Sequence, residues 1–104
     1  MAKKLILAAS PTFKSKVSIP IPGGSPVLVE FTFKHRRKDD LFTWAQNLAG
    51  IEDVDLIKDV ASGWDLDDEF NDANITELTQ TYCGSARAIL DRYFAEQTGA
   101  KLGN

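Results

Sequence analysis

The fold of this chain is decided by residues 13–34, which read FKSKVSIPIPGGSPVLVEFTFK. In the first half, polar residues separate the apolar ones with a period of two, at Phe13, Val17, Ile19 and Ile21. The second half repeats this period at Val27, Val29, Phe31 and Phe33. Between them, Pro22–Pro26 contains two glycines and is a strong turn signal. The stretch therefore predicts an antiparallel β-hairpin with one apolar face.

From residue 38 onward the apolar residues follow the period of a helix. The first helix is expected to begin near Asp39 and Asp40 and to end at Gly50. A second apolar stripe covers residues 51–61 and stops at Gly63. A capping box with Asn74 as the cap opens a third, short helix that continues to Tyr82. The fourth helix is expected from about Ser85 until Gly99 terminates it.

Strands followed by helices predict an α+β fold, not a βαβ alternation. Its predicted elements are an N-terminal antiparallel hairpin and about four helices, and Leu5-Ile6-Leu7 is a candidate third strand. A chain of 104 residues is expected to be one domain, residues 1–104. Within it, residues 1–37 are expected to be β-rich and residues 38–104 helical.

The composition excludes several classes of protein. No apolar run approaches the roughly 20 residues that span a bilayer. The start of the chain has a basic end and an apolar stretch, but that stretch is shorter than the about 7–15 residues of a signal peptide. The single cysteine, Cys83, rules out an intramolecular disulfide. We therefore expect a reduced protein that stays inside the cell and does not associate with a membrane.

Residues suited to catalysis or metal binding are few, so we expect neither an enzyme nor a cofactor. His35 is the only histidine and sits among four cationic residues, without the carboxylate that orients a catalytic imidazole. Cys83 has no second histidine to activate it. The acidic run from Asp65 fails the calcium-loop pattern, because Phe70 takes the glycine position and Thr76 the position of the bidentate glutamate.

The net charge of −3 conceals a separation of charge along the chain. Residues 1–38 carry eight Lys or Arg against Glu30 alone, whereas residues 52–72 carry nine acids against Lys58. This polarity can drive weak association between copies, or it can simply mark two solvated faces. The isoelectric point near 5.0 argues against binding of nucleic acid by the basic stretch Lys34–Lys38.

The segment Ser62–Phe70 places large apolar residues among acidic ones. Large apolar side chains in such a segment are either buried in the core or covered by a binding partner; here they are Trp64, Leu66 and Phe70. As a core residue, Trp64 would anchor the loop between two helices, with the carboxylates left outside. Both interpretations stay open at this point.

The order of these motifs matches a known pattern. A helix leads through Gly63-Trp64 into an acidic link with Phe70, followed by Asn74–Leu78, Tyr82 and a longer helix that carries Ala88-Ile89-Leu90 and Tyr93. In this respect residues 27–104 resemble the tail assembly chaperones of long, non-contractile-tailed phages, and the passage Phe31–Trp44 is similar too. The family often has proline after the aromatic residue at position 82, where this chain has Cys83.

The resemblance implies a protein of the host cytoplasm that coats the tape measure protein before the tail tube forms and that is absent from the virion. It also implies a longer form, made by ribosomal frameshifting, that recruits tail tube protein. Leu102-Gly103-Asn104 can be encoded by a slippery heptamer. The candidate partner-binding or loop-anchoring residues are Trp64, Leu66, Phe70, Tyr82 and Tyr93. The alternative is a structural tail component, such as a tail terminator or a tube-like subunit, that is retained in the virion.

Overall fold

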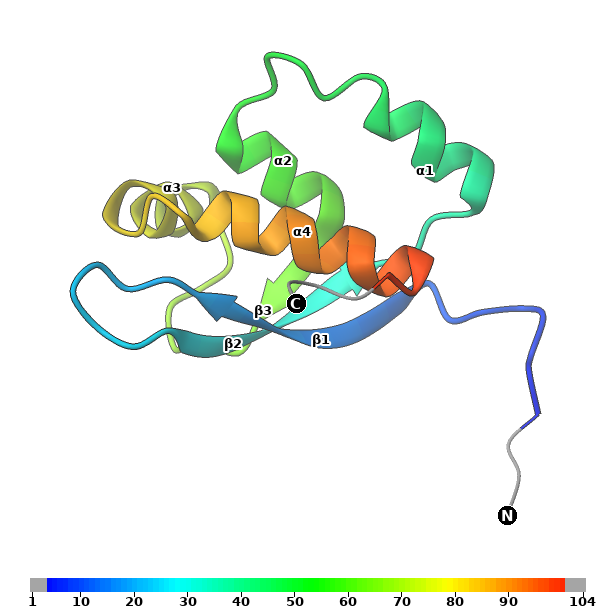
Figure 1. The fold of residues 1–104 in the computed structure, drawn as a ribbon, viewed down its shortest axis with the longest axis horizontal. Coiled ribbons are helices and arrows are strands. Elements are labelled where there is room, and N and C mark those ends of the chain that lie inside the picture. The colour runs from blue at the N-terminus through cyan, green and yellow to red at the C-terminus, as the bar shows by residue number, and fades with distance from the viewer. Residues whose placement is uncertain (1–3, 101–104) are drawn as a thin grey trace.

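The computed structural model describes residues 4–100 of the chain. Within this range the elements follow in the order β1 (Thr12–Ile19), β2 (Val27–Lys34), α1 (Lys38–Ala45), α2 (Asp53–Val60), β3 (Ala61–Trp64), α3 (Asp72–Thr81) and α4 (Ser85–Thr98) (Figure 1). The predicted α+β class, the N-terminal hairpin and the four helices are confirmed. The slippery sequence proposed for residues 102–104 lies outside the described residues.

The hairpin forms as its period of two predicts. β1 and β2 pair antiparallel with Val17 opposite Val29, and the turn is closed by a 2.9 Å hydrogen bond from the Gly24 N–H to the Ile21 carbonyl. Gly23 has a φ of +76°, a backbone region that favours glycine. The predicted apolar face is buried at Val17, Ile19, Val29, Phe31 and Phe33.

Val27 departs from the prediction that it belongs to the buried face, because 53% of its surface is exposed. It pairs with Ile19 at the turn end of the hairpin. Ile19 itself is buried, because α4 packs along β1, so the helical cover at this end lies over β1 and does not reach Val27 on β2. Alternation along a strand identifies the face of a residue, but burial also requires an element packed over that point.

The third strand is not the predicted one. Leu5-Ile6-Leu7 forms no strand, and the sheet is completed by β3, which pairs antiparallel with β2 and gives the order β1-β2-β3. Ala61, predicted as the last residue of the second helical stripe, is thus the first residue of a strand. The open edge of β2 offers ladder partners to residues 61–64, and these partners prevail over the local helical period.

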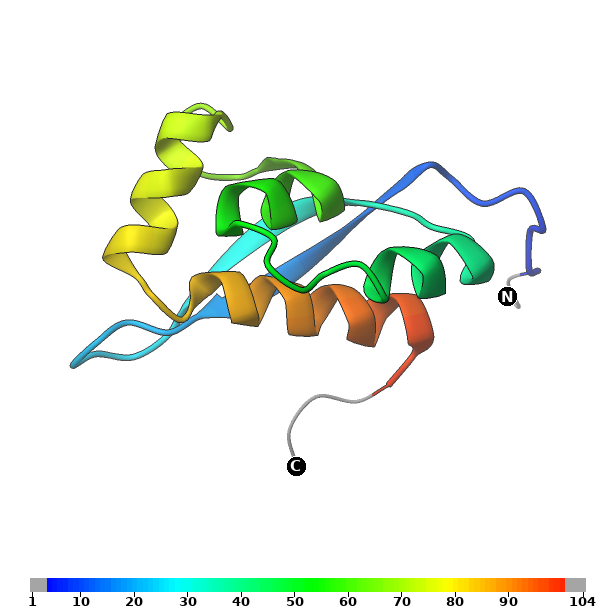
Figure 2. The ribbon, with the colours of Figure 1, turned by 90° about the horizontal axis from the view of Figure 1, so that it is seen from above.

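The core lies between one face of the sheet and the helices. α4 packs along β1, and α2 contacts both β2 and α4, so the two helices cover the same face (Figures 1 and 2). From the sheet, this core receives the buried residues of the hairpin. From the helices it receives Leu41, Leu56, Ile57, Val60, Ile75, Leu78, Ala86, Ile89 and Tyr93.

Two helix boundaries differ from the prediction. α1 ends at Ala45, and not at Gly50, because the Asn47 N–H bonds over 3.0 Å to the carbonyl of Trp44, three residues back, and no longer continues the α-helical ladder. α3 begins one turn earlier than predicted, since Asn71 caps it in place of Asn74. The predicted end of α4 is confirmed, with Gly99 in the left-handed region at a φ of +77°.

Candidate functional site

The acidic link between β3 and α3 is held in place by Trp64. The indole packs edge-on against Phe31 on β2, with ring centres 6.0 Å apart, and against Phe70 at the far end of the link, at 5.0 Å. Its Nε1–H donates a 2.7 Å hydrogen bond to the carbonyl oxygen of Asp68. Trp64 and Phe70 together therefore brace both ends of this loop from inside.

The beginning of the link is also tied to the sheet through its backbone. The Asp65 N–H donates to the Glu30 carbonyl over 3.0 Å, and the Asp65 carboxylate accepts from the Glu30 N–H over 3.0 Å. This pair extends the contact between β2 and β3 by one residue. The following acids, Asp67, Asp68 and Glu69, remain exposed to solvent, so the link presents negative charge at a fixed place.

A groove lies between this link and α3. Its volume is about 350 Å³, and we call it the aromatic groove. Trp64, Leu66, Leu78 and Tyr82 supply its apolar lining, while Asp68 and Glu77 contribute carboxylates. Leu66 is 36% exposed, and Trp64 and Tyr82 are half-buried. The structure thus brings three of the candidate residues, Trp64, Leu66 and Tyr82, onto one surface.

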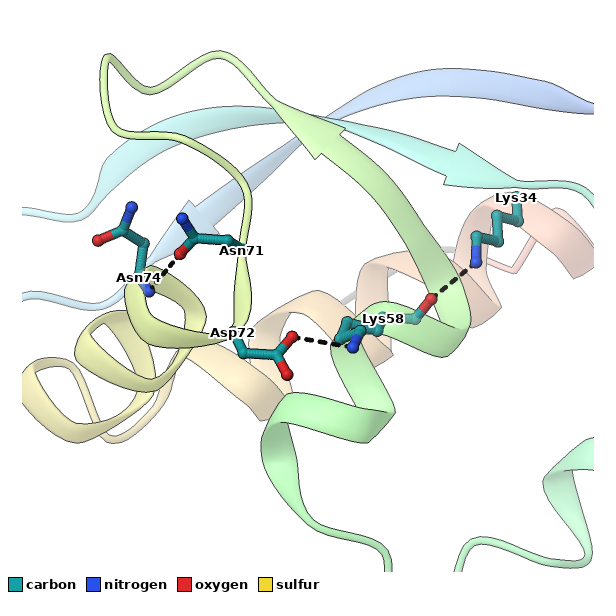
Figure 3. A network of polar contacts seen from close by, with 5 residues as sticks. All are labelled: Lys34, Lys58, Asn71, Asp72 and Asn74. Atoms are coloured by element: carbon teal, nitrogen blue, oxygen red, sulfur yellow. Dashed lines mark hydrogen bonds and ion pairs between the residues drawn. The ribbon is translucent and has the colours of Figure 1, made fainter.

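Polar contacts fix α3, which forms one wall of the groove, to the rest of the molecule. The Lys58 ammonium on α2 pairs with the Asp72 carboxylate at 2.8 Å, and the Lys34 ammonium on β2 donates to the Lys58 carbonyl at 2.8 Å (Figure 3). The hydrogen bond and charge of Asp72 raise the pKa of Lys58 above its usual 10.5. Because this ion pair is exposed, it orients α3 relative to α2 but adds little to the free energy of unfolding.

The first turn of α3 is closed by its own cap. The side-chain oxygen of Asn71 accepts a 2.9 Å hydrogen bond from the Asn74 N–H (Figure 3). The Asn74 side chain in turn donates to the Glu69 carbonyl over 2.8 Å. The cap therefore links the end of the acidic link to the helix that carries Glu77 and Leu78.

Two candidates lie outside the groove: Phe70 packs against Trp64 at the edge of the core, and Tyr93 lies in the core itself. Its side chain is fully buried and stacks near Phe13 and Phe33. The hydroxyl donates to the Lys34 carbonyl at 2.8 Å and accepts from the Arg36 guanidinium at 2.9 Å. Burial raises the pKa of this phenol above 10.0, although Arg36 opposes the shift.

Arg36 is a residue that sequence reasoning missed. It lay in a basic stretch that suggested only solvent exposure or phosphate contact, yet its guanidinium lies 4.5 Å from the centre of the Trp44 ring. Gln97 on α4 holds its backbone, accepting from the Arg36 N–H at 2.7 Å and donating to its carbonyl at 3.2 Å. The spacing of eight residues between Arg36 and Trp44 matches neither a helical nor a strand period, so the sequence does not predict this contact. The contact depends on how α1 packs against the rest of the molecule.

A second hollow has the opposite charge. It measures about 400 Å³, lies beside the start of α1, and is lined by His35, Arg36, Arg37, Lys38, Leu41 and Phe42 among others; we call it the basic hollow. Both ribbon views place α1 and α3 at opposite ends of the molecule (Figures 1 and 2). The charge separation of the sequence therefore becomes two separate surface hollows, one acidic and aromatic, the other basic.

Metal-binding clusters and membrane-spanning helices are both absent from the part of the chain that the structure describes. Residues 4–100 contain no group of three or more His, Cys, Asp or Glu side chains arranged to hold a metal ion. In the same residues, no helix has the length and apolar character needed to cross a membrane. Cys83 is exposed and forms no disulfide.

Comparison with known proteins identifies a family. A family model described as phage tail assembly chaperone matches residues 1–104, the whole length of the chain. Neither the curated proteins nor the solved structures contain a match.

Proposed function

Because the chain belongs to the phage tail assembly chaperone family, we propose that it is a non-catalytic protein of the host cytoplasm that binds the tape measure protein. In this role it keeps a long, helical client soluble until the tail tube assembles around it. The protein then leaves and is absent from the finished virion. The family match supports the chaperone role itself, and the client and the compartment are our proposal.

The observation that carries the proposal is the aromatic groove. It combines half-buried aromatic rings with an exposed leucine, Leu66, and it has the carboxylates of Asp68 and Glu77 at its margin. A groove of this kind suits a few anchoring side chains of an amphipathic helix, spaced at i, i+3 or i+4. The carboxylates favour helices that carry Lys or Arg beside the apolar stripe.

A single groove of about 350 Å³ is at the small end of ligand pockets, which measure about 300–1,000 Å³. Each contact with the client is therefore expected to be weak. Many copies along one rod raise the overall affinity without any new contact, because later binding events occur at high effective concentration. Weak individual contacts also let the tube displace the coat copy by copy.

We propose in addition that a longer form exists, produced by −1 frameshifting near Leu102, and that its extra domain recruits tail tube protein. A segment added after α4 would not disturb the core, because Gly99 and Ala100 are exposed. Gly103 is then encoded by GGA within the sequence GGGAAAT or GGGAAAC. Another glycine codon at that position, or an immediate stop in the −1 frame, would exclude this part of the proposal.

The binding role is tested by co-expression with the tape measure protein of the same phage. The wild-type chain should keep the client soluble and co-purify with it. Leu66→Arg places a positive charge in the lining of the groove. It should reduce the amount of client that co-purifies at least ten-fold. Phe42→Ser is the matched control, because it removes an exposed apolar side chain from the basic hollow instead.

Equal loss in both variants, or in neither, would contradict a client site in the groove. The virion is the second readout. Mass spectrometry of purified particles should detect no copies of this chain. Stoichiometric copies in the virion would instead favour the structural alternative, a tail terminator or tube-like subunit.

A further inference from the structure

The N-terminal arm, residues 4–11, holds the most exposed large apolar side chains among the residues that the structure describes. Figure 1 shows it running away from the sheet after leaving β1. Leu5, Ile6 and Leu7 are 89%, 73% and 94% exposed, and none of them packs on the core. The arm is tied down at its end by a 2.9 Å hydrogen bond from the His35 N–H to the Pro11 carbonyl. Three consecutive exposed aliphatic residues indicate a segment that binds elsewhere.

The charge of the arm discriminates between the two hollows of the molecule. Lys4 directly precedes the apolar residues, and the sequence has a second lysine at position 3. The basic hollow, with Arg36, Arg37 and Lys38 in its lining, would repel such a segment. The aromatic groove offers Asp68 and Glu77 beside its apolar lining and has the complementary charge.

We propose that the arm of one copy binds in the aromatic groove of a second copy. In an extended chain, residues two apart point to the same side, so Leu5 and Leu7 can enter the groove together. There they would cover Trp64, Leu66 and Tyr82, with Lys4 close to the carboxylates of Asp68 and Glu77.

The occupant is a second copy because of where the two surfaces lie. Both views place the arm at one end of the molecule and α3, which walls the groove, at the other (Figures 1 and 2). Such a contact is heterologous, since each copy uses its arm on one neighbour and its groove on another. It therefore produces rings or open chains of copies, not a closed pair that uses the same surface twice.

The contact has a consequence that rests on the proposed function. If the groove also receives the tape measure protein, the arm keeps the groove covered while no client is present. Client and arm would then compete for one surface. The arm–groove contact itself needs no client, so the experiment is done without one.

The test is sedimentation of the full 104-residue protein over a range of concentrations. An arm variant, Leu5→Ser/Leu7→Ser, and a groove variant, Leu66→Arg, should each weaken self-association at least ten-fold. Leu28→Ser is the control, because Leu28 is exposed on β2, outside both surfaces. It should associate like the wild type.

Mixing the two variants gives the sharper result. The arm variant retains a groove and the groove variant retains an arm, so the mixture should form a 1:1 complex and nothing larger. A peptide of residues 1–11 should bind the arm variant, and Glu77→Lys, introduced on exposed surface of α3, should weaken that binding at least ten-fold. Because Glu77→Lys changes the groove at a different position, it shows whether a loss of binding by Leu66→Arg is due to the groove or to misfolding of that variant.

Several outcomes would overturn the proposal. The first is self-association of the arm variant equal to that of the wild type, and the second is absence of the 1:1 complex on mixing. The third is an arm that is protected from proteolysis to the same extent at every protein concentration. The last would mean that the arm folds back on its own copy. If the peptide binds the groove but the tape measure protein does not, the proposed client site fails while the arm contact stands.

Discussion

At the scale of single residues, Tyr93 joins more parts of the molecule than any other candidate residue. It lies on α4, its ring packs among aromatic side chains of the hairpin, and its hydroxyl bonds to the Lys34 carbonyl and to Arg36. One side chain thus fixes the last helix, the end of β2 and the entry into α1. The contact is structural, because the ring is fully buried.

The raised pKa of Tyr93 predicts a loss of stability in alkali. The folded protein keeps a phenolic proton that the unfolded chain releases near pH 10.0, so the free energy of unfolding falls as the pH rises through and above that value. Tyr93→Phe should flatten this fall and, near neutral pH, cost about 1 kcal/mol through the lost hydrogen bonds. Urea unfolding at several pH values measures both effects.

Lys58 supplies the control for this prediction. Its pKa is also raised, by Asp72, so its protonation likewise favours the fold below pH 10.5 and ceases to do so as the pH rises further. Because that ion pair is exposed, Lys58→Gln should change the decrease of the free energy of unfolding with alkaline pH less than Tyr93→Phe does. A larger effect from Lys58→Gln would contradict the burial argument for Tyr93.

Trp64 carries the second prediction at this scale. Trp64→Ala should lower the free energy of unfolding by about 3 kcal/mol, the lower end for loss of a large aromatic side chain, since Trp64 is half-buried. Trp64→Phe keeps a ring against Phe31 and Phe70 but loses the donor to Asp68, and should cost about 1 kcal/mol. Denaturant melts of both variants measure this. Unchanged stability of Trp64→Ala, with loss of client, would make the residue a contact and not an anchor.

At the scale of elements, the cap of α3 couples helix stability to the groove. Asn71→Ala removes the acceptor of the Asn74 N–H and should cost about 1 kcal/mol, or about 4–8 °C in the melting temperature of a domain of this size. Asn71→Asp retains a capping oxygen and should melt like the wild type. Because α3 carries Glu77 and Leu78, Asn71→Ala should also weaken binding of the residue 1–11 peptide.

A cap at Asn74, as the sequence pattern indicated, would have the opposite signature. Asn74→Ala would then destabilise the helix more than Asn71→Ala. In the structure the Asn74 side chain donates to the Glu69 carbonyl on the exposed side of the loop. Its removal is expected to cost less than the loss of the cap.

At the scale of the whole molecule, the segregated charges predict association that depends on salt. Between copies, the basic hairpin region can meet the acidic segment 52–72, and such exposed charges are screened over about 8 Å at physiological ionic strength. The arm variant Leu5→Ser/Leu7→Ser isolates this contribution, because its aliphatic arm is gone. Sedimentation should show larger species of this variant at low salt than at high salt. Association that strengthens with salt would indicate apolar contacts outside the arm.

What the sequence determined by itself was local. The period of two around Pro22–Pro26 predicted the hairpin, and the helical period closed by Gly99 predicted α4, because both patterns depend on neighbours a few residues apart. The order of motifs from Trp64 to Tyr93 also sufficed to indicate the family, which the match to residues 1–104 confirms. The predicted single domain has no comparable test and stays a prediction.

Only the tertiary structure decided which segment completed the sheet and where the candidate residues met. Leu5–Leu7 has the composition of a strand, yet Ala61–Trp64 took the place beside β2. Leu66 and Tyr82 share a groove, while Tyr93 is buried and accepts a hydrogen bond from Arg36. A strand needs the hydrogen-bonding edge of another strand, and a groove needs walls from separate elements, so neither can be read from residues that adjoin in the chain.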